Sequence, residues 1–316
     1  MENIAILMGG SSKEKEISFK SADTIYEYID KSRYNPYKVL CINKYEFEVI
    51  DSNKNIPIHI KDFSFILNQK RIQFDKIYMM IHGDPGENGK LCDYFEKLNL
   101  PYTSCNTSTS ELTFNKFKCN TYLRKLGFMV PESEIVQDEK SKNIQFPCII
   151  KPARSGSSFG IAKVHNYDEL EKAIYEANKY DRYIIQEQFI KGREVTCAVF
   201  NDNQIIKTLP ITEIISENDI FDYAAKYQGK SKEITPANID QKIEEKITNI
   251  ARKIYKKLKL SGLIRIDFII NDQSPYIIEI NTIPGFSKES IVPQMLKCGN
   301  INITEFINSE LERISK

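Results

Sequence analysis

The sequence predicts an α/β fold in its first part and a mixed α+β fold in the remainder. Over the first hundred residues, short apolar runs alternate with segments of helical periodicity, which is typical of a doubly wound parallel sheet. Beyond that point, strand and helix patterns mix without regular alternation. A length of 316 residues suggests about two domains. Three lobes, 1–104, 105–193 and 194–316, fit these changes of pattern better.

The first lobe is predicted from strands and helices that alternate along the chain. Ile4–Met8 is continuously apolar, as a strand buried on both faces should be. Further strands are expected at Tyr37–Ile42 and Lys76–Ile81, and helices at about Glu16–Ile29 and Lys90–Leu98. Ligands bind beyond the C-terminal ends of the strands in such sheets. The polar loops Gly9–Glu16 and His82–Gly89 both follow strands, and they are therefore candidate binding loops.

The second and third lobes are predicted from less regular patterns. A loop region is expected from Glu213 to Ala237, between a strand near Glu194–Phe200 and a long amphipathic helix near Gln241–Leu258. The other predicted elements are helices at Asn115–Leu126 and Asp168–Ala177, strands at Phe146–Lys151, Ile161–Val164, Tyr183–Gln186, Gly262–Ile270 and Pro275–Asn281, and a C-terminal helix.

Composition and charge exclude several classes of protein. The chain has 44 Lys and Arg against 43 Asp and Glu, and a net charge of +1 gives no general reason to bind nucleic acid or an anionic membrane. Apolar runs such as Ile77–Ile81 are far shorter than the ~18 residues of a membrane span, and the N-terminus lacks a signal-peptide pattern. Seven Cys without metal-type spacing indicate free thiols in a reducing compartment. We therefore expect a cytoplasmic protein with no nucleic-acid or membrane partner.

The sharpest chemical signal is a pair of strands near the C-terminus. Because strand side chains alternate between faces, Arg265 shares a face with Asp267, and Glu279 shares a face with Asn281. If these strands form a hairpin across Asn271–Pro275, Asp267 faces Glu279 and Arg265 faces Asn281. Carboxylate and amide oxygens that converge in this way suit Mg²⁺ shared with phosphate groups. An ordinary exposed hairpin with a cross-strand ion pair is the alternative.

A glycine- and serine-rich segment, 151–160, supplies a second signal. Small residues let backbone N–H groups approach phosphate oxygens, and Lys151 at the preceding strand end brings a positive charge to the same place. The segment lacks the GK[ST] of a Walker A loop, and a strand follows it. It is typical of a lid over a nucleotide, with a plain hairpin turn as the alternative.

Three single residues near strand ends give weaker signals. Glu194 stands beside a strand that runs into a linker, where it suits ribose hydroxyls. Glu14, at a strand-to-helix turn, suits a substrate ammonium, and His82 lies in the loop after a later strand of the same sheet. Charged residues at strand ends are usually only solvated, and a lone loop His is more often structural than catalytic.

Taken in chain order, these motifs resemble those of the D-alanine–D-alanine ligases of the ATP-grasp superfamily. The resemblance runs over essentially the whole chain, and it is specific because many short pieces occur in the right order. The matching segments are Met8–Ser12 with Glu14 and Glu16–Ser18, His82–Gly83 with Gly86–Gly89, Leu100–Thr103, Lys116, Lys151–Pro152 with Gly156–Gly160, Glu187, Phe221–Tyr223 with Lys226–Tyr227, Arg265–Asp267, and Glu279–Thr282 with Pro284–Gly285. The resemblance implies a three-lobed ATP-grasp architecture: an N-terminal Rossmann-like domain for the first substrate, a central lid domain, and a C-terminal domain with the metal and catalytic residues.

The resemblance also implies a reaction. ATP phosphorylates the carboxylate of a first D-alanine, the amine of a second D-alanine attacks the acyl phosphate, and a tetrahedral intermediate loses phosphate. The product, D-alanyl-D-alanine, serves peptidoglycan precursor synthesis. ATP and two Mg²⁺ ions are the implied cofactors, with Mn²⁺ as a substitute for Mg²⁺, and relatives are commonly homodimers.

Residue roles carry over position by position from the same resemblance. The nucleotide set is Lys116 and Lys151 for the phosphates, Glu187 for adenine, Glu194 for ribose, and Ser157, Ser158 and Lys226 beside them. The metal set is Asp267, Glu279 and Asn281. The catalytic and substrate set is Arg265 and the Gly285 backbone for the oxyanion, Glu14 with His82 nearby for the first ammonium, Ser290 for the second carboxylate, and Ser157 with Tyr227 for lid closure.

The sequence departs from the family pattern at three positions. Asn88 stands where a second acidic residue is usual, Ser155 where a Glu is common, and Gln188 where a Lys is common. We expect these departures to affect affinity and helix packing more than activity, because the residues that carry the chemistry are present.

Three alternatives differ in substrate or in class. Some relatives use D-lactate or D-serine as the acceptor, and Tyr227 favours D-alanine because lactate-forming relatives tend to lack that tyrosine. A ligase for another carboxylate and amine is disfavoured by Glu14 and His82. A nucleotide-binding module without activity would show erosion among the metal ligands and at Arg265, and these residues are intact.

Overall fold

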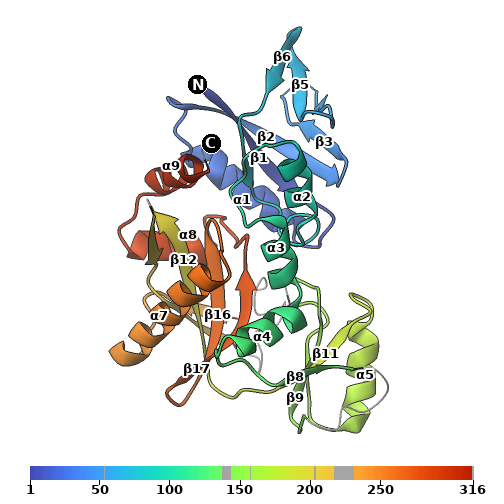
Figure 1. The fold of residues 1–316 in the computed structure, drawn as a ribbon, viewed down its shortest axis with the longest axis vertical. Helices are drawn as coiled ribbons and strands as arrows, with labels where there is room; N and C mark the ends of the chain where they lie inside the picture. Colours follow the sequence, from blue (N-terminus) through green and yellow to red (C-terminus); the bar gives the residue numbers. More distant parts are fainter. Residues whose placement is uncertain (53, 137–143, 157, 203, 217–230, 315–316) are drawn as a thin grey trace.

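The computed structural model describes residues 1–52, 54–136, 144–156, 158–202, 204–216 and 231–314. These residues form a five-stranded, a four-stranded and a six-stranded sheet, with a separate two-stranded hairpin. Figure 1 shows the five-stranded sheet at one end of the molecule and the other two large sheets at the opposite end. Within the described part of the chain, no helix is both long enough and apolar enough to span a membrane.

The five-stranded sheet is centred on β1 (Glu2–Gly9), which pairs in parallel with β2 (Tyr34–Asn43) and β7 (Lys76–Met79). Its strand order is β4-β3-β2-β1-β7, and helix α1 (Lys15–Tyr28) packs against β1. The parallel strands and the helix that follows β1 confirm the predicted α/β character of this region. The other elements up to residue 114 are β3 (Glu46–Val49), β4 (Ile56–Pro57), β5 (Ser64–Leu67), β6 (Lys70–Gln73), α2 (Lys90–Lys97) and α3 (Thr107–Phe114).

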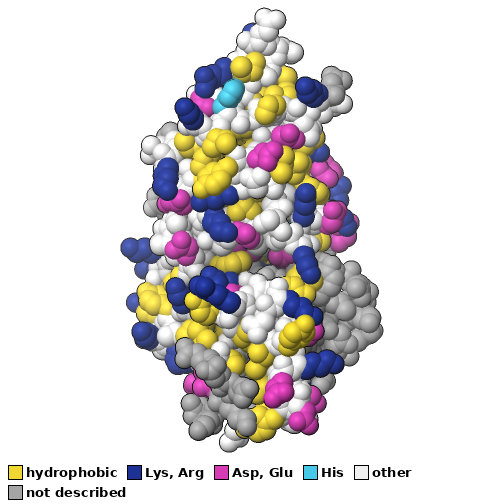
Figure 2. All heavy atoms as spheres, turned by 90° about the vertical axis from the view of Figure 1, so that its right-hand side faces the viewer, with side chains coloured by type: hydrophobic (Ala, Val, Ile, Leu, Met, Phe, Trp, Pro, Cys, Tyr) yellow, Lys and Arg dark blue, Asp and Glu magenta, His cyan; other side chains and the backbone are white. Residues whose placement is uncertain are grey.

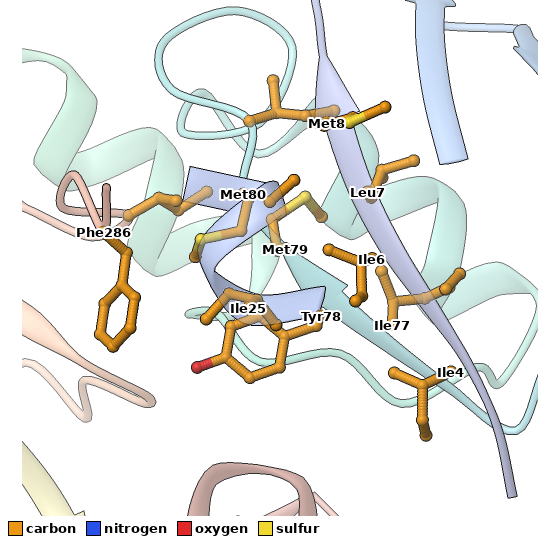
Figure 3. Close-up of a cluster of buried hydrophobic side chains, with 14 of the residues drawn as sticks. Ile4, Ile6, Leu7, Met8, Ile25, Ile77, Tyr78, Met79, Met80 and Phe286 are labelled. Atoms are coloured by element: carbon orange, nitrogen blue, oxygen red, sulfur yellow. The ribbon is translucent and has the colours of Figure 1, made fainter. Parts of the chain in front are cut away.

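The core of this region includes side chains from the far end of the chain. Ile6 and Leu7 of β1, Ile25 of α1 and Ile77 of β7 are completely buried. Figure 3 shows them in one cluster with Phe286, which comes from the C-terminal part of the sequence. Because apolar burial is the main stabilising contribution to folding, this shared core fixes the C-terminal segment against the N-terminal sheet.

The four-stranded sheet is smaller and antiparallel, with the order β10-β9-β11-β8. Its elements are β8 (Ser133–Ile135), β9 (Cys148–Pro152), β10 (Ala162–Val164), α5 (Tyr167–Ala177) and β11 (Ile184–Gln188), preceded by α4 (Lys116–Lys125). The glycine-rich segment joins β9 to β10, which agrees with the two predicted strands on either side of it. Cys119 and Leu123 of α4 belong to the core of the six-stranded sheet, although α4 precedes the four-stranded sheet in the chain. The division into domains at residues 104 and 193 therefore stays a prediction.

The six-stranded sheet has the order β15-β14-β12-β16-β17, with β13 paired to β12. Its elements are β12 (Arg193–Asp202), β13 (Ile205–Thr208), β14 (Thr212–Ser216), β15 (Ser231–Ile234), α7 (Gln241–Lys257), β16 (Ile264–Asn271) and β17 (Ser274–Asn281), followed by α8 (Ile291–Cys298) and α9 (Ile303–Arg313). Helix α7 buries residues at helical spacing, including Ile243, Ile247 and Ala251, in one cluster with Ile266 and Phe268 of β16. The opposite face of β16 is therefore left for its polar residues.

The hairpin of β16 and β17 has the predicted register at its polar end and a different register at its turn. Arg265 pairs with Asn281 and Asp267 with Glu279, but a bulge follows, and Phe268 pairs with Ile277. Ile277 is buried, whereas Ile278, which simple alternation would place on the face opposite Glu279, is half-buried. The inserted residue moves Ile277 onto the core face.

Three other expectations were incomplete or wrong. The predicted loop from Glu213 to Ala237 contains β14 and β15, which pair in an antiparallel ladder. The short strands β3 to β6, β8 and β13 and the helix α3 were not anticipated, and the C-terminal helix is two helices, α8 and α9. β15 has the sequence SKEI, which has no apolar alternation, so its strand conformation depends on pairing with β14.

Basic and acidic side chains are interspersed on the face of the molecule shown in Figure 2. That face therefore carries no extended field of one sign.

We predict that Ile247→Ala lowers the free energy of unfolding by about 2–5 kcal/mol, because it leaves a cavity between α7 and the sheet. The measurement is the urea midpoint with its slope. Ile205→Ala is the matched control, because Ile205 is 62% exposed and its truncation should change stability by less than about 0.5 kcal/mol. Equal losses for the two variants would contradict the assigned packing.

Candidate functional site

A pocket of about 520 Å³ lies where the loops after β1 and β7 meet the glycine-rich segment and the end of β17. We call it the central pocket. The predicted site residues that line it are Glu14, His82, Arg265, Glu279, Asn281, Gly285 and Ser290. Loops that follow β1 and β7 contribute to it, which confirms the expected position at the C-terminal ends of those strands. Segments that are distant in sequence thus converge on one cavity.

Asp267 is held by three neighbours on the polar face of the β16–β17 hairpin. Arg265 donates from Nε and Nη2 to its two carboxylate oxygens, at 2.9 Å each, and Asn281 Nδ2 donates at 3.0 Å. Thr196 of β12 adds a hydrogen bond of 2.6 Å from Oγ1 to Oδ1. The predicted face is therefore confirmed, whereas Thr196 was missed because it comes from a neighbouring strand.

Glu279 is paired with a lysine from a distant helix. Lys116 Nζ lies 2.5 Å from Glu279 Oε1 and also donates to the Ser155 carbonyl oxygen, at 2.6 Å. Burial alone would lower the pKa of Lys116, but the Glu279 carboxylate, supported by Glu87 and Glu14, outweighs burial and raises it. Lys116 therefore stays charged, and it ties the start of α4 to β17 and to the glycine-rich segment.

A second buried pair lies in the four-stranded sheet. Lys151 Nζ of β9 is 2.5 Å from Glu187 Oε1 of β11, and both side chains are almost fully buried. Asn120 Nδ2 of α4 donates to the other Glu187 oxygen, at 3.2 Å. Removing one partner of such a pair leaves an uncompensated buried charge. The two residues assigned to ATP phosphates and adenine thus contact each other.

The Glu14 carboxylate lies between the backbones of two loops. A Cβ atom built on Gly83 would lie 3.3 Å from Glu14 Oε2, and one built on Gly156 would collide with the same oxygen. Gly83 belongs to the loop after β7, and Gly156 belongs to the glycine-rich segment. The absence of a side chain at Gly156 therefore lets the glycine-rich segment rest on the carboxylate at the start of α1.

His82 is fixed by hydrogen bonds at both ring nitrogens. Nδ1 lies 2.7 Å from the Ile283 carbonyl oxygen, which can only accept, so Nδ1 carries the proton. Nε2 then accepts from Ser21 Oγ at 3.2 Å, and Ser21 Oγ accepts from the Phe286 backbone N–H at 3.0 Å. Burial lowers the pKa of His82 although Glu14 is near. The neutral ring positions the 283–286 segment.

Glu87 is a site residue that lies within a matching sequence motif but was given no role there. Its carboxylate accepts from the backbone N–H of Gly83 at 2.8 Å and of Ile283 at 3.3 Å. Burial, and then the charge of Glu14, raise the pKa of Glu87 to about 7. A carboxyl with this pKa holds or releases a proton near neutral pH.

The far wall of the central pocket is formed by the segment that leads into α8. Ser290 Oγ accepts from the Ser287 backbone N–H at 3.1 Å and lies 2.8 Å from Ser287 Oγ. A Cβ atom on Gly285 would lie 3.1 Å from Ser290 Oγ. The two predicted residues are therefore adjacent.

The remaining predicted residues do not line this pocket or cannot be placed. Glu194 lies in β12 opposite Ile269, on the same sheet face as Asp267, and Ser158 has a positive φ of 56° within the glycine-rich segment. Ser157, Lys226 and Tyr227 lie outside the described residues.

The residues assigned to metal have the right chemistry for Mg²⁺. Asp267 and Glu279 face each other across the hairpin, and Asn281 lies two residues along on the same face. Carboxylate and amide oxygens are the ligands that Mg²⁺ takes. Arg265 and Lys116 neutralise the two carboxylates in this structure. The described ranges contain no group of three or more His, Cys, Asp or Glu that is placed to hold a metal ion. The assigned residues are two carboxylates and an amide.

Comparisons with known proteins agree over the whole chain. Family models described as D-ala D-ala ligase N-terminus and D-ala D-ala ligase C-terminus match residues 3–105 and 116–312. The chain is 43% identical over 320 residues to a D-alanine–D-alanine ligase of Flavobacterium johnsoniae, with 99% of both chains covered. It is 42% identical over 319 residues to one of Phocaeicola vulgatus, with 98% of both covered. The crystal structure of the VanG D-Ala:D-Ser ligase from Enterococcus faecalis has a TM-score of 0.88 at 30% identity, with 98% of both chains covered.

We predict that Glu87 makes the protein less stable as the pH rises. Its pKa of about 7 in the folded protein exceeds the ordinary 4.5, so the associated stability is present below pH 4.5 and is lost as the pH rises to about 7. The loss is on the order of 3 kcal/mol or less. Glu87→Gln stays neutral, so it should gain stability relative to the wild type between pH 5 and pH 8.

The measurement is the urea midpoint of both proteins at the two pH values. Glu171→Gln is the control, since Glu171 is exposed on α5, and its difference from the wild type should not change with pH. A pH-independent difference for Glu87→Gln would mean that Glu87 is already ionised in the folded protein at pH 5.

Proposed function

The chain belongs to the D-alanine–D-alanine ligase family, and we propose that its central pocket is where ATP-dependent joining of two D-alanine molecules takes place. The protein is a ligase of the ATP-grasp type, and its product serves peptidoglycan synthesis. The observation that carries the assignment to this pocket is the meeting of Arg265, Glu279 and Asn281 with Glu14 around one cavity.

The reaction has two stages. The carboxylate of the first D-alanine takes the terminal phosphoryl group of ATP and becomes an acyl phosphate. The amine of the second D-alanine then attacks the acyl carbon, and the tetrahedral intermediate loses phosphate. Each stage develops negative charge on oxygen, so fixed positive charge and N–H donors are what the protein must supply.

The nucleotide is proposed to lie against the glycine-rich segment. Lys116 and Lys151 would hold its phosphates. Both are buried, Lys151 at the start of that segment and Lys116 in contact with its Ser155 carbonyl oxygen. Glu187 and Glu194 would bind adenine and ribose, with Ser157, Ser158 and Lys226 completing the nucleotide set. Lys116 contacts Glu279 and Lys151 contacts Glu187, so phosphate binding would redistribute the hydrogen bonds of two existing pairs.

Asp267, Glu279 and Asn281 would hold Mg²⁺, and we propose two ions, with Mn²⁺ able to substitute. When bound, the metal supplies positive charge to the phosphate oxygens. The chain's own contribution is to orient the donors: Arg265, Asn281 and Thr196 fix the Asp267 carboxylate from three directions.

The substrates are proposed to bind on opposite sides of the reacting carbon. Glu14 would bind the ammonium of the first D-alanine, and His82 would keep the neighbouring segment in place. Arg265 and the Gly285 backbone N–H would stabilise the oxyanion, and Ser290 would hold the carboxylate of the second D-alanine. Lid closure through Ser157 and Tyr227 remains a proposal from the sequence.

The alternatives considered from the sequence have less support. A D-Ala:D-Ser ligase is among the structural relatives at 30% identity, but the D-alanine–D-alanine ligases reach 43%. A D-lactate acceptor has no comparable relative among those described above. We further propose a cytoplasmic homodimer. The seven Cys are unpaired, which is consistent with a reducing compartment.

The experiment that tests this function uses the purified protein with ATP, Mg²⁺ and D-alanine, D-serine or D-lactate. Phosphate release and product mass are read together. D-alanyl-D-alanine as the main product supports the proposal, and phosphate release without a dipeptide contradicts it.

We predict that Glu279→Gln reduces ligation roughly 100-fold or more while the fold stays intact, because the variant removes both a metal-binding charge and the partner of Lys116. The measurement is phosphate release at saturating Mg²⁺, with circular dichroism as the check on folding. Glu245→Gln, which changes an exposed residue of α7, is the control and should keep full activity. Near-wild-type turnover of Glu279→Gln would remove Glu279 from the metal set.

A further inference from the structure

Glu233 of β15 is a carboxylate of the central pocket to which no role has yet been assigned. Asp267 is paired with Arg265, and Glu279 with Lys116. Glu233 of β15 lines the same pocket, yet among the described residues no Lys or Arg forms an ion pair with it. Its carboxylate is half-buried, and the positive charge that acts on it is that of Arg265, which already binds both carboxylate oxygens of Asp267. A ligand ammonium would therefore add to an incomplete compensation of a partly desolvated carboxylate.

Glu233 is nevertheless held in place. Gln294 Nε2 of α8 donates to a Glu233 carboxylate oxygen at 2.9 Å and to the Glu289 carbonyl oxygen at 3.1 Å. Gln294 thus anchors the edge strand β15 to the first turn of α8. A neutral amide in this position fixes the carboxylate without neutralising it.

The position of Glu233 relative to Ser290 suits an α-amino acid. Ser290 immediately precedes α8, and Gln294 lies four residues later, one helical turn away. Ser290 is the N-cap of α8, and its backbone is extended, so it lies at the start of the helical turn that carries Gln294. An amino acid whose carboxylate contacts Ser290 can therefore direct its ammonium towards a carboxylate held by Gln294.

The charges around the pocket favour the same orientation. Six acidic residues line it, namely Glu14, Glu16, Glu87, Glu233, Glu279 and Glu289. Its basic lining residues are Lys13, Lys20 and Arg265. Glu14 is already assigned to the first ammonium, and it lies in a different lobe from Glu233. The two substrates would each bring one ammonium, and the pocket offers a carboxylate on each side.

We propose that Glu233, positioned by Gln294, binds the ammonium of the second D-alanine and so determines that the acceptor is an amino acid rather than a hydroxy acid. This inference rests on the proposed function and adds a specificity-determining residue to it. A hydroxy acid such as D-lactate has no ammonium, so it gains nothing from this contact.

The test compares wild type, Glu233→Gln and Glu233→Asp with D-alanine and D-lactate as acceptors. Gln keeps an oxygen that accepts from Gln294 but removes the charge. We expect Glu233→Gln to raise the KM for the second D-alanine roughly 10- to 100-fold, the usual range for a hydrogen bond to a charged group. Glu233→Asp should recover part of that loss. In competition, the ratio of D-alanyl-D-lactate to D-alanyl-D-alanine should rise by a similar factor.

Two controls show whether the loss is confined to binding of the second D-alanine. With hydroxylamine in large excess over D-alanine as the acceptor, the initial rate of hydroxamate formation should be the same in wild type and Glu233→Gln, because the first stage does not use Glu233. Glu171→Gln, a charge change on the exposed face of α5, should leave the KM of both D-alanine molecules unchanged.

An unchanged KM for the second D-alanine, or an equal loss with D-alanine and with D-lactate, would overturn the inference and leave Glu233 as an anchor of β15. A wild-type protein that forms no dipeptide would overturn the proposed function itself, and the inference with it.

Discussion

The site depends on one antiparallel pairing, that of β16 with β17. Because successive strand side chains point to opposite faces, a shift of one residue would turn Asp267 into the core under α7 and bring Ile266 or Phe268 to the pocket. The large apolar side chains on the α7 face therefore specify where the carboxylates lie. Apolar packing on one face of the hairpin thus determines which charged side chains lie on the opposite face.

Charge compensation connects the three regions around this hairpin. Lys116 comes from the helix before the four-stranded sheet, yet it pairs with Glu279 of β17 and holds the Ser155 carbonyl of the glycine-rich segment. Glu14, from the first region, lies against Gly156 of the same segment. Contacts of this kind cost desolvation and add little net stability, but they fix the relative positions of groups that must meet around one substrate.

The sequence was informative wherever the decisive pattern was local. The facing of Asp267 and Glu279 follows from strand alternation and a short turn, and the structure confirms it. Glu87, Thr196 and Glu233 were not assigned, because what distinguishes them is burial and neighbours from distant segments. The strand β15 was missed for a related reason: its short polar sequence becomes a strand only against β14. Strict alternation of side chains along a strand likewise does not predict the bulge that places Ile277 in the core.

The core shared by the two ends of the chain bears on how the protein is made. Phe286, together with Phe306 and Leu311 of α9, belongs to the same buried cluster as Ile6 and Leu7 of β1. Synthesis proceeds from the N-terminus, so the apolar surface that receives these side chains emerges from the ribosome long before they do. Part of the apolar surface of the N-terminal sheet therefore stays exposed to solvent until α9 has left the ribosome. Chaperones bind exposed apolar surface of this kind during synthesis.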